Sequence, residues 1–284
     1  MSFGRVIFGD NQFLGINHAS PDKAALFQDR FSHADAIIEV IGWAYDAGVR
    51  DFMFTTHGRL EDAFREIISS RLFPEMSYIP CLPDTYKYAN ALAEGSFVSV
   101  IGKRLVASSK RGVLGGIGRA AVGDLGGLMQ LLVEVELLMT KGMRIKGVFL
   151  HNVIFDLAIG LHGTRILERF HRYVEDRLSA TPGYITINHP IAQRVLCHDI
   201  GIKRPWICSN FNVAGFRMNP SQPAVEQSYG NGLSKNIAMS VFASGILNPT
   251  DSINYITKSA GIDSVLFGSS RQANIVANVG LISG

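Results

Sequence analysis

Residues that can exchange protons recur in this sequence directly after short, strand-like runs. His57 follows the run 51–55, and His151 follows the run 148–150. Imidazole gains or loses a proton near neutral pH, so two histidines at equivalent positions favour acid–base chemistry. Other polar residues stand at similar positions and suit the orientation of a polar substrate: Asp10, Asn11, Asp84, Asn188, His189 and Asn210. We therefore predict that His57 and His151 face one pocket and that the second group binds the substrate.

Each of these residues also has a simpler interpretation. His57 could cap the helix that follows it, and His151 could be a hydrogen-bonded histidine at the rim of a fold. Asn188 and Asn210 could satisfy loop backbone, and Asp10 could accept backbone N–H groups. The predicted site depends on the coincidence of these residues on one face rather than on any one of them.

The C-terminal segment predicts a site for an anion. Residues 265–267 read as a buried strand, Gly268, Ser269 and Ser270 as a tight turn, and Arg271 as the start of a helix. Free N–H groups and the helix dipole attract negative charge at such a helix start. The alternative is an ordinary turn between a strand and a helix.

The elements that would position these residues alternate along the chain. Apolar runs predict strands at 5–8, 51–55, 78–82, 148–150, 184–187, 206–209, 237–242 and 265–267. Helical patterns lie between or after them at 34–47, 60–72, 125–141, 164–178, 191–199, 250–259 and 271–281. Eight such units predict a closed parallel (β/α)₈ TIM barrel, whose chemistry sits at the C-terminal ends of its strands.

An open doubly wound sheet is the second candidate for the fold. It would need a glycine-rich fingerprint directly after an early strand. The glycines at 112–127 instead follow a polar stretch, so they favour a loop. We predict one domain over 1–284, with long connections at 84–146 and 212–236 that are either lids over the barrel mouth or simple insertions.

Composition excludes several classes of protein. The 284 residues carry a net charge of +3, and the 27 Lys and Arg are scattered, which argues against nucleic-acid binding. Three distant cysteines and the lack of a signal-peptide pattern or a long apolar run predict a cytoplasmic protein without a membrane anchor. We expect a small-molecule substrate and allow for a homo-oligomer.

Two kinds of catalytic site find little support in the spacing of residues. His57, His151 and His189 with Asp10 or Asp84 could ligate a metal, but no HxH or HExxH spacing occurs, so we predict no metal. A serine hydrolase of the GxSxG type is equally unsupported.

Several segments resemble the aldo-keto reductases. Residues 48–58, Gly-Val-Arg-Asp-Phe-Met-Phe-Thr-Thr-His-Gly, resemble that family's second strand. Residues 147–152, Gly-Val-Phe-Leu-His-Asn, resemble its fourth strand, which ends in the catalytic histidine. Residues 186–188 and 240–245 are similar to its fifth and seventh strands, and Gly268 and Asn278 lie ten residues apart, as around its cofactor-phosphate helix. The resemblance implies a catalytic His151 and an NADP site formed by Gly268, Ser269, Ser270, Arg271 and Asn278.

The chain departs from that family at its other catalytic positions. The family's acid is a tyrosine, where this chain has His57, and its third-strand lysine has no counterpart in 78–83. The family's aspartate falls on Phe52 or Met53. The tyrosine that stacks on nicotinamide falls on Val241 or Phe242.

These differences predict non-redox acid–base chemistry on the same kind of barrel. A lyase, epimerase, isomerase or dehydratase acting on a small polar carbonyl, sugar-like or phosphorylated compound would fit. One alternative is an NADP(H)-dependent carbonyl reductase with His57 in place of the tyrosine. Another is a non-catalytic barrel that binds a nucleotide or a partner protein.

Overall fold

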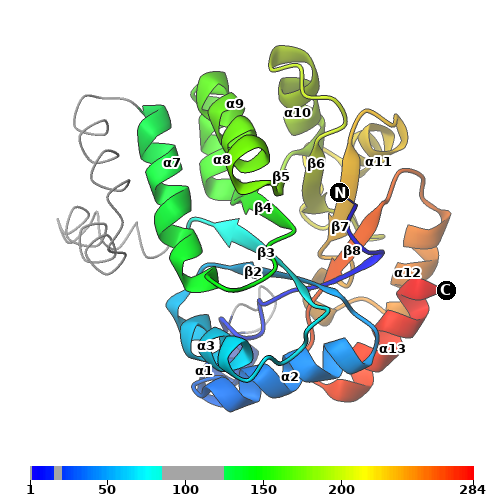
Figure 1. The fold of residues 1–284 in the computed structure, drawn as a ribbon. Helices are drawn as coiled ribbons and strands as arrows, with labels where there is room; N and C mark the ends of the chain where they lie inside the picture. The colour runs from blue at the N-terminus through cyan, green and yellow to red at the C-terminus, as the bar shows by residue number, and fades with distance from the viewer. Residues whose placement is uncertain (1, 16–20, 85–124) are drawn as a thin grey trace.

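Eight parallel strands close into a barrel, each one paired with its neighbours in chain order (Figure 1). The computed structural model describes residues 2–15, 21–84 and 125–284. The strands are β1 (Val6–Phe8), β2 (Asp51–Thr55), β3 (Ser77–Leu82), β4 (Gly147–Leu150), β5 (Thr181–Thr186), β6 (Trp206–Asn210), β7 (Lys235–Met239) and β8 (Ser264–Phe267). The predicted (β/α)₈ barrel is confirmed, and the open sheet is wrong.

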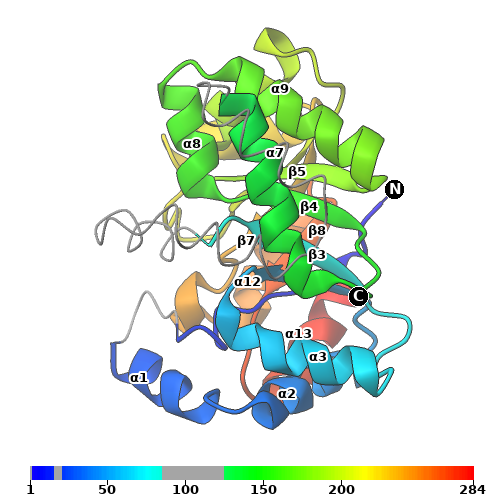
Figure 2. The ribbon, with the colours of Figure 1, turned by 60° about the vertical axis from the view of Figure 1, so that its left-hand side comes forward.

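Helices surround the strands (Figures 1 and 2). They include α1 (Pro21–Arg30), α2 (Ala34–Asp46), α3 (Glu61–Ser69), α7 (Leu125–Glu136), α8 (Asn152–Gly160), α9 (Thr164–Arg172), α10 (His189–Arg194), α11 (Gln222–Gly230), α12 (Pro249–Lys258) and α13 (Gln272–Ser283). Figure 2 shows α7 beside α9, which it contacts. Within the described ranges, no helix is long and apolar enough to cross a membrane.

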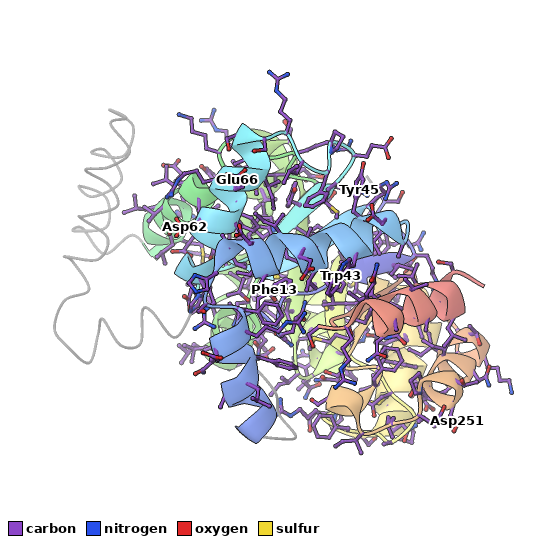
Figure 3. All side chains as sticks on the ribbon, turned by 90° about the horizontal axis from the view of Figure 1, so that it is seen from below. Phe13, Trp43, Tyr45, Asp62, Glu66 and Asp251 are labelled. Atoms are coloured by element: carbon purple, nitrogen blue, oxygen red, sulfur yellow. The ribbon has the colours of Figure 1, made fainter. Side chains whose placement is uncertain are left out.

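The helix α2 shows how the sequence builds this outer layer. Its residues Ile37, Val40, Ile41 and Ala44 recur at intervals of three and four and are buried on one face. Figure 3 shows α2 crossing the underside of the molecule, with α3 on one side of it and α13 on the other. Apolar periodicity therefore fixes which face of each helix covers the barrel.

Strand side chains alternate between the lumen of the barrel and this helix layer. One cluster of buried residues fills the lumen: Phe3, Ile7, Met53, Ile79, Cys81, Phe149, Trp206, Cys208 and Ile237. The intervening residues, such as Phe8, Phe52 and Leu150, belong to the clusters that pack against helices. The barrel is therefore solid, and polar residues that follow its strands lie above an apolar floor.

Some predicted boundaries were wrong for local reasons. The predicted strand 237–242 ends at Met239, because Ser240 has a φ of 56° and leaves the extended conformation. The connection 212–236 contains α11, and α8 was not expected after β4. The predicted helices 164–178 and 191–199 end in π-helical segments, Tyr173–Arg177 and Val195–Asp199. Most of the predicted glycine-rich loop lies outside the described residues.

Packing in the lumen generates the first prediction. A methyl group at Gly183 on β5 would overlap the ring of Phe149 on β4, whose side chain is fully buried. We expect Gly183→Ala to lower the free energy of unfolding by about 1–3 kcal/mol, as overpacking does. Chemical denaturation measures the effect.

Gly280→Ala is the matched control, because nothing lies near the added methyl group on α13. A helical glycine-to-alanine change should instead leave stability unchanged or raise it by up to about 1 kcal/mol. Equal stabilities of Gly183→Ala and the wild type would contradict the described packing of the lumen.

Candidate functional site

Three of the predicted site residues lie near one another at the C-terminal ends of neighbouring strands. Asp10 follows β1, Asp84 follows β3 and His151 follows β4. Burial raises the pKa of Asp10 and lowers that of His151, and the charge of Asp84 acts upward on both, so Asp84 interacts with each of the other two groups. Because strand ends of one barrel share a rim, this group forms the centre of the candidate site.

Asp10 is a buried carboxylic acid group. Only 6% of the residue is exposed, and the backbone N–H of Thr55 donates to its Oδ2 atom at 2.7 Å. Burial raises the pKa of Asp10 to about 7, against the opposing effect of the hydrogen bonds from Thr55. A carboxyl group that titrates near neutral pH can both accept and return a proton under physiological conditions.

Glu136 supports this rim, although it was not expected from the sequence. It is fully buried near the end of α7 and accepts a hydrogen bond from the hydroxyl group of Thr56. The backbone N–H of Asp84 lies 3.5 Å from the same carboxylate oxygen. Glu136 continues the buried positions Met129 and Val133 at helical spacing, and a carboxylate on an apolar helix face was the signal available in the sequence.

The two histidines both cap the segments that follow them. The backbone N–H of Arg59 donates to Nδ1 of His57 at 3.1 Å, and the N–H of Val153 donates to Nδ1 of His151 at 3.4 Å. His57 therefore does act as a cap, which was the simpler interpretation of this residue. In both rings the cap uses Nδ1 and leaves Nε2 for other partners. In the described part of the chain, no hydrogen bond or ring contact joins the two histidines to each other.

Capping determines which ring nitrogen carries the proton. An imidazole Nδ1 that accepts an N–H bond has a free lone pair, so the proton of the neutral ring lies on Nε2. Burial lowers the pKa of His151, although the charge of Asp84 raises it, and the ring stays neutral at physiological pH. His151 is thus arranged to donate a hydrogen bond from Nε2 rather than to accept a proton there.

The three asparagines differ in their surroundings. Asn188 caps α10, because its Oδ1 accepts the backbone N–H of Ile191 at 3.3 Å. Asn210 is buried at the end of β6 and donates to the backbone oxygen of Arg217 at 3.2 Å. Asn11 is exposed. Asn210 thus lies at the same strand-end level as His151, while the side-chain oxygen of Asn188 serves the local backbone.

His189 lies in the layer between the barrel and its helices, and the structure does not bring it to the rim. Its Nδ1 is 2.7 Å from the hydroxyl of Ser228 on α11, and its Nε2 is 2.9 Å from Oδ1 of Asn236 on β7. The ring packs 4.4 Å from that of Tyr229 and is fully buried. With both nitrogens bonded inside the protein, His189 joins α10, α11 and β7.

The side chain of Gln12 lies against the turn after β8, which the sequence did not predict. A side chain at Gly268 would overlap Oε1 of Gln12, so the glycine provides space for this glutamine. Gln12 is buried and donates from Nε2 to the backbone oxygen of Gly9 at 2.7 Å, while Oε1 has no partner in the described residues. A buried acceptor without a partner suits a ligand that carries a hydroxyl or N–H group.

The helix start after this turn is flanked by positive charge. The guanidinium group of Arg30 at the end of α1 donates to the backbone oxygen of Ser270 at 2.7 Å. Ser270 is buried, Ser269 accepts the backbone N–H of Arg271 at 3.4 Å, and Arg271 is exposed at the N-cap of α13. Asn278 lies on the buried face of α13. Arg30 is a second cation here, which the sequence did not place.

The described residues contain no group of three or more histidine, cysteine, aspartate or glutamate side chains placed to hold a metal ion. The residues considered as metal ligands lie in two different places. Asp10, Asp84, His57 and His151 follow strands at the rim, whereas His189 is bonded to Ser228 and Asn236 in the helix layer.

Comparison with solved structures places the fold among the aldo-keto reductases. No protein-family model and no curated protein sequence matches the chain. A putative aldo-keto reductase from Pseudomonas aeruginosa matches with a TM-score of 0.64 at 12% identity, over 100% of this chain and 90% of the other. An aldo/keto reductase from Brucella melitensis matches with 0.54 at 12%, over 99% and 88%. The glycerol dehydrogenase of Gluconobacter oxydans matches with 0.57 at 11%, over 99% and 87%. The distant resemblance is confirmed for the fold.

The His189 network yields a prediction for stability against pH. Burial lowers the pKa of His189 to about 4, below the usual value for an unfolded chain. The unfolded state therefore binds a proton first as the pH falls, and stability is lost between about pH 6.5 and 4. We expect a loss of up to about 3 kcal/mol by pH 4 that is missing in His189→Gln, measured by urea denaturation at several pH values.

His33→Gln provides the control, because His33 is exposed and its side chain caps nothing. That variant should follow the wild-type curve. If His189→Gln lost as much stability on acidification as the wild type, the neutral, buried state of His189 would be disproved.

Proposed function

We propose that this protein is an acid–base enzyme that acts on a small polar carbonyl compound without redox chemistry. The observation that carries the proposal is the neutral, capped His151 at the barrel rim, where Asp84 interacts with both His151 and Asp10. A neutral imidazole at the start of a helix can polarise a carbonyl group through its remaining ring N–H. Charge that develops on the carbonyl oxygen during proton removal is stabilised by that bond.

The other rim residues have supporting roles in this proposal. His57 presents a second Nε2 for a hydrogen bond, since its Nδ1 is also engaged as a cap. Asn210 and Asn11 orient polar groups of the substrate, and Asp84 keeps His151 in place electrostatically. The oxygen of Gln12 accepts a hydroxyl of the ligand, which suits a sugar-like compound.

The NADP(H)-dependent reductase is the second candidate, favoured by the fold it shares with the reductases. The residues present do not fit the nicotinamide arrangement of that family. Val241 is buried in the outer core, so its side chain offers no stacking surface at the rim. The partly buried Phe242 packs edge-on against Phe267 of the same core, with ring centroids 6.4 Å apart. We derive no hydride step and propose that the ligand is smaller than a dinucleotide.

The anion site remains part of the proposal. The start of α13, with Ser269, Ser270 and the flanking Arg30 and Arg271, would hold a phosphate group of the substrate. A cytoplasmic location and a small-molecule substrate accord with this function.

A first test addresses the role of His151. His151→Asn keeps a side-chain oxygen that can cap α8 but lacks the ring N–H, so the fold should persist. We expect turnover to fall by about 10²–10⁴-fold. The assay follows, by ¹H NMR in D₂O, the loss of the signal of the hydrogen on the carbon next to the carbonyl as it exchanges for deuterium. The compounds tested are triose, pentose and hexose phosphates and the corresponding free sugars.

His162→Asn is the matched control, since His162 is exposed and has a φ of 54° that asparagine tolerates. Exchange at the wild-type rate in His151→Asn would remove His151 from the mechanism. NADPH fluorescence is measured in parallel: tight binding with NADPH-dependent carbonyl reduction would favour the reductase. Tight ligand binding that survives loss of both histidines, without turnover, would favour the binding barrel.

A second test addresses the anion. Sulfate or phosphate should raise the melting temperature more than chloride does at equal ionic strength, because an ion that binds only the folded state stabilises it. Arg30→Gln should reduce that rise, whereas Arg65→Gln on the exposed face of α3 should not. An equal rise in both variants would show that the ions act without the α13 site.

A further inference from the structure

The capped histidines leave the proposed reaction without a base. A base needs a free lone pair directed at the substrate, but in the capped tautomer Nε2 of His57 and of His151 carries hydrogen. Moving the proton to Nδ1 would break the bond from Arg59 or Val153. The proton must therefore be taken by another group near the rim.

Two neighbouring groups, Cys81 and Glu136, are less suitable than Asp10. Burial and the charges of Asp10 and Cys208 raise the pKa of Cys81, so its thiol stays protonated. Glu136 is fully buried and already bonded to Thr56. The backbone N–H of Asp84 also approaches Glu136, which ties this segment to α7.

Asp10 is a buried carboxyl group that a backbone hydrogen bond holds in place. Thr55 donates its backbone N–H to Oδ2 at 2.7 Å, which fixes the orientation of the carboxyl. Among the described residues, no arginine or lysine forms a salt bridge with it. The groups that face it are Thr55 of β2, Cys81 of β3 and Asp84, which follows β3.

We propose that Asp10 is the acid–base residue of this site and that it moves a proton between neighbouring carbons of an α-hydroxy carbonyl compound. The proposal rests on the proposed function and names the group that carries it out. Asp10 accounts for a role that neither histidine can fill while capping its helix. A single base works on one face of the substrate, which favours an isomerase over an epimerase that needs an acid on the opposite face.

The proposed step balances without an oxidant or reductant. An oxygen of ionised Asp10 takes the hydrogen from the carbon next to the carbonyl as a proton. The electron pair of that C–H bond forms a C=C bond, and the carbonyl π pair moves to the oxygen, which accepts the Nε2–H bond of His151. Asp10 then returns the proton to the neighbouring carbon, while a hydroxyl proton moves between the two substrate oxygens and the new carbonyl forms.

The protonation behaviour of Asp10 agrees with this geometry. Burial raises the pKa of Asp10 to about 7, and the charge of Asp84 adds to the increase. The ionised form that accepts a proton becomes abundant above that pH, and the protonated form remains accessible for the return step. Activity should therefore rise as the pH passes through about 7.

The activity test compares Asp10→Asn with His151→Asn in the D₂O exchange assay. Asp10→Asn retains an oxygen that can accept the Thr55 N–H but cannot take a proton. We expect exchange to fall by about 10²–10⁴-fold in this variant and the rise near pH 7 to disappear. Exchange that survives in Asp10→Asn but is lost in His151→Asn overturns the role of Asp10 and leaves the proposed function standing. No exchange by the wild type on any compound of the panel overturns the proposed function and the role of Asp10 with it.

A second test needs no substrate. Because the raised pKa of Asp10 means that ionisation is costlier in the folded state, stability is lost as the pH rises from about 4 toward 7. Asp10→Asn should melt at a higher temperature than the wild type at pH 8 and at the same temperature at pH 4. Asp62→Asn, an exposed change on α3 (Figure 3), should show no such difference between the two pH values. Equal melting of Asp10→Asn and the wild type at pH 8 contradicts the proposed protonation of Asp10.

Discussion

The filled lumen of the barrel is the constraint on which the candidate site depends. Apolar side chains from alternate strand positions close the interior, so the proposed ligand site lies above them, at the rim, and not inside the lumen. Polar groups just above this floor are cut off from water on one side. For Asp10 this burial disfavours the ionised form and raises the pKa to about 7. A carboxyl group with such a pKa can gain and lose a proton near neutral pH.

Helix capping is the second determinant of the chemistry. His151 lies between β4 and α8, and its Nδ1 accepts a hydrogen bond from the backbone N–H of Val153 at the start of α8. The cap holds the ring and selects the tautomer, and for this reason the proposed mechanism assigns the donor and the base to different residues. The solved structures that share this fold include aldo-keto reductases, whereas the sequence comparison places His57 where that family has a tyrosine. One fold can carry different chemistries through the side chains at its strand ends.

The positions of residues within strands and directly after them could be predicted from the sequence, because strands are marked by a local apolar pattern. Asp10 and Asp84 at the rim are such cases. The position of the His189 side chain could not be predicted in this way. His189 is the first residue of α10, and its direction depends on how that helix packs against α11. The contribution of Glu136 was equally hidden, since it reaches Thr56 from a helix 80 residues further along the chain.

The sequence by itself determined the eight strand–helix units, and with them the closed barrel and the rim on which its strand-end residues meet. These follow from hydrophobic periodicity, a property of neighbouring residues. Only the tertiary structure decided which of those polar groups are capped, buried or paired. That Gln12 fills the space at Gly268, that Arg30 reaches Ser270 and that Asp10 is buried beside Asp84 all depend on contacts between distant segments. Such contacts set the local dielectric and the hydrogen-bond partners, and these in turn determine the protonation of each group.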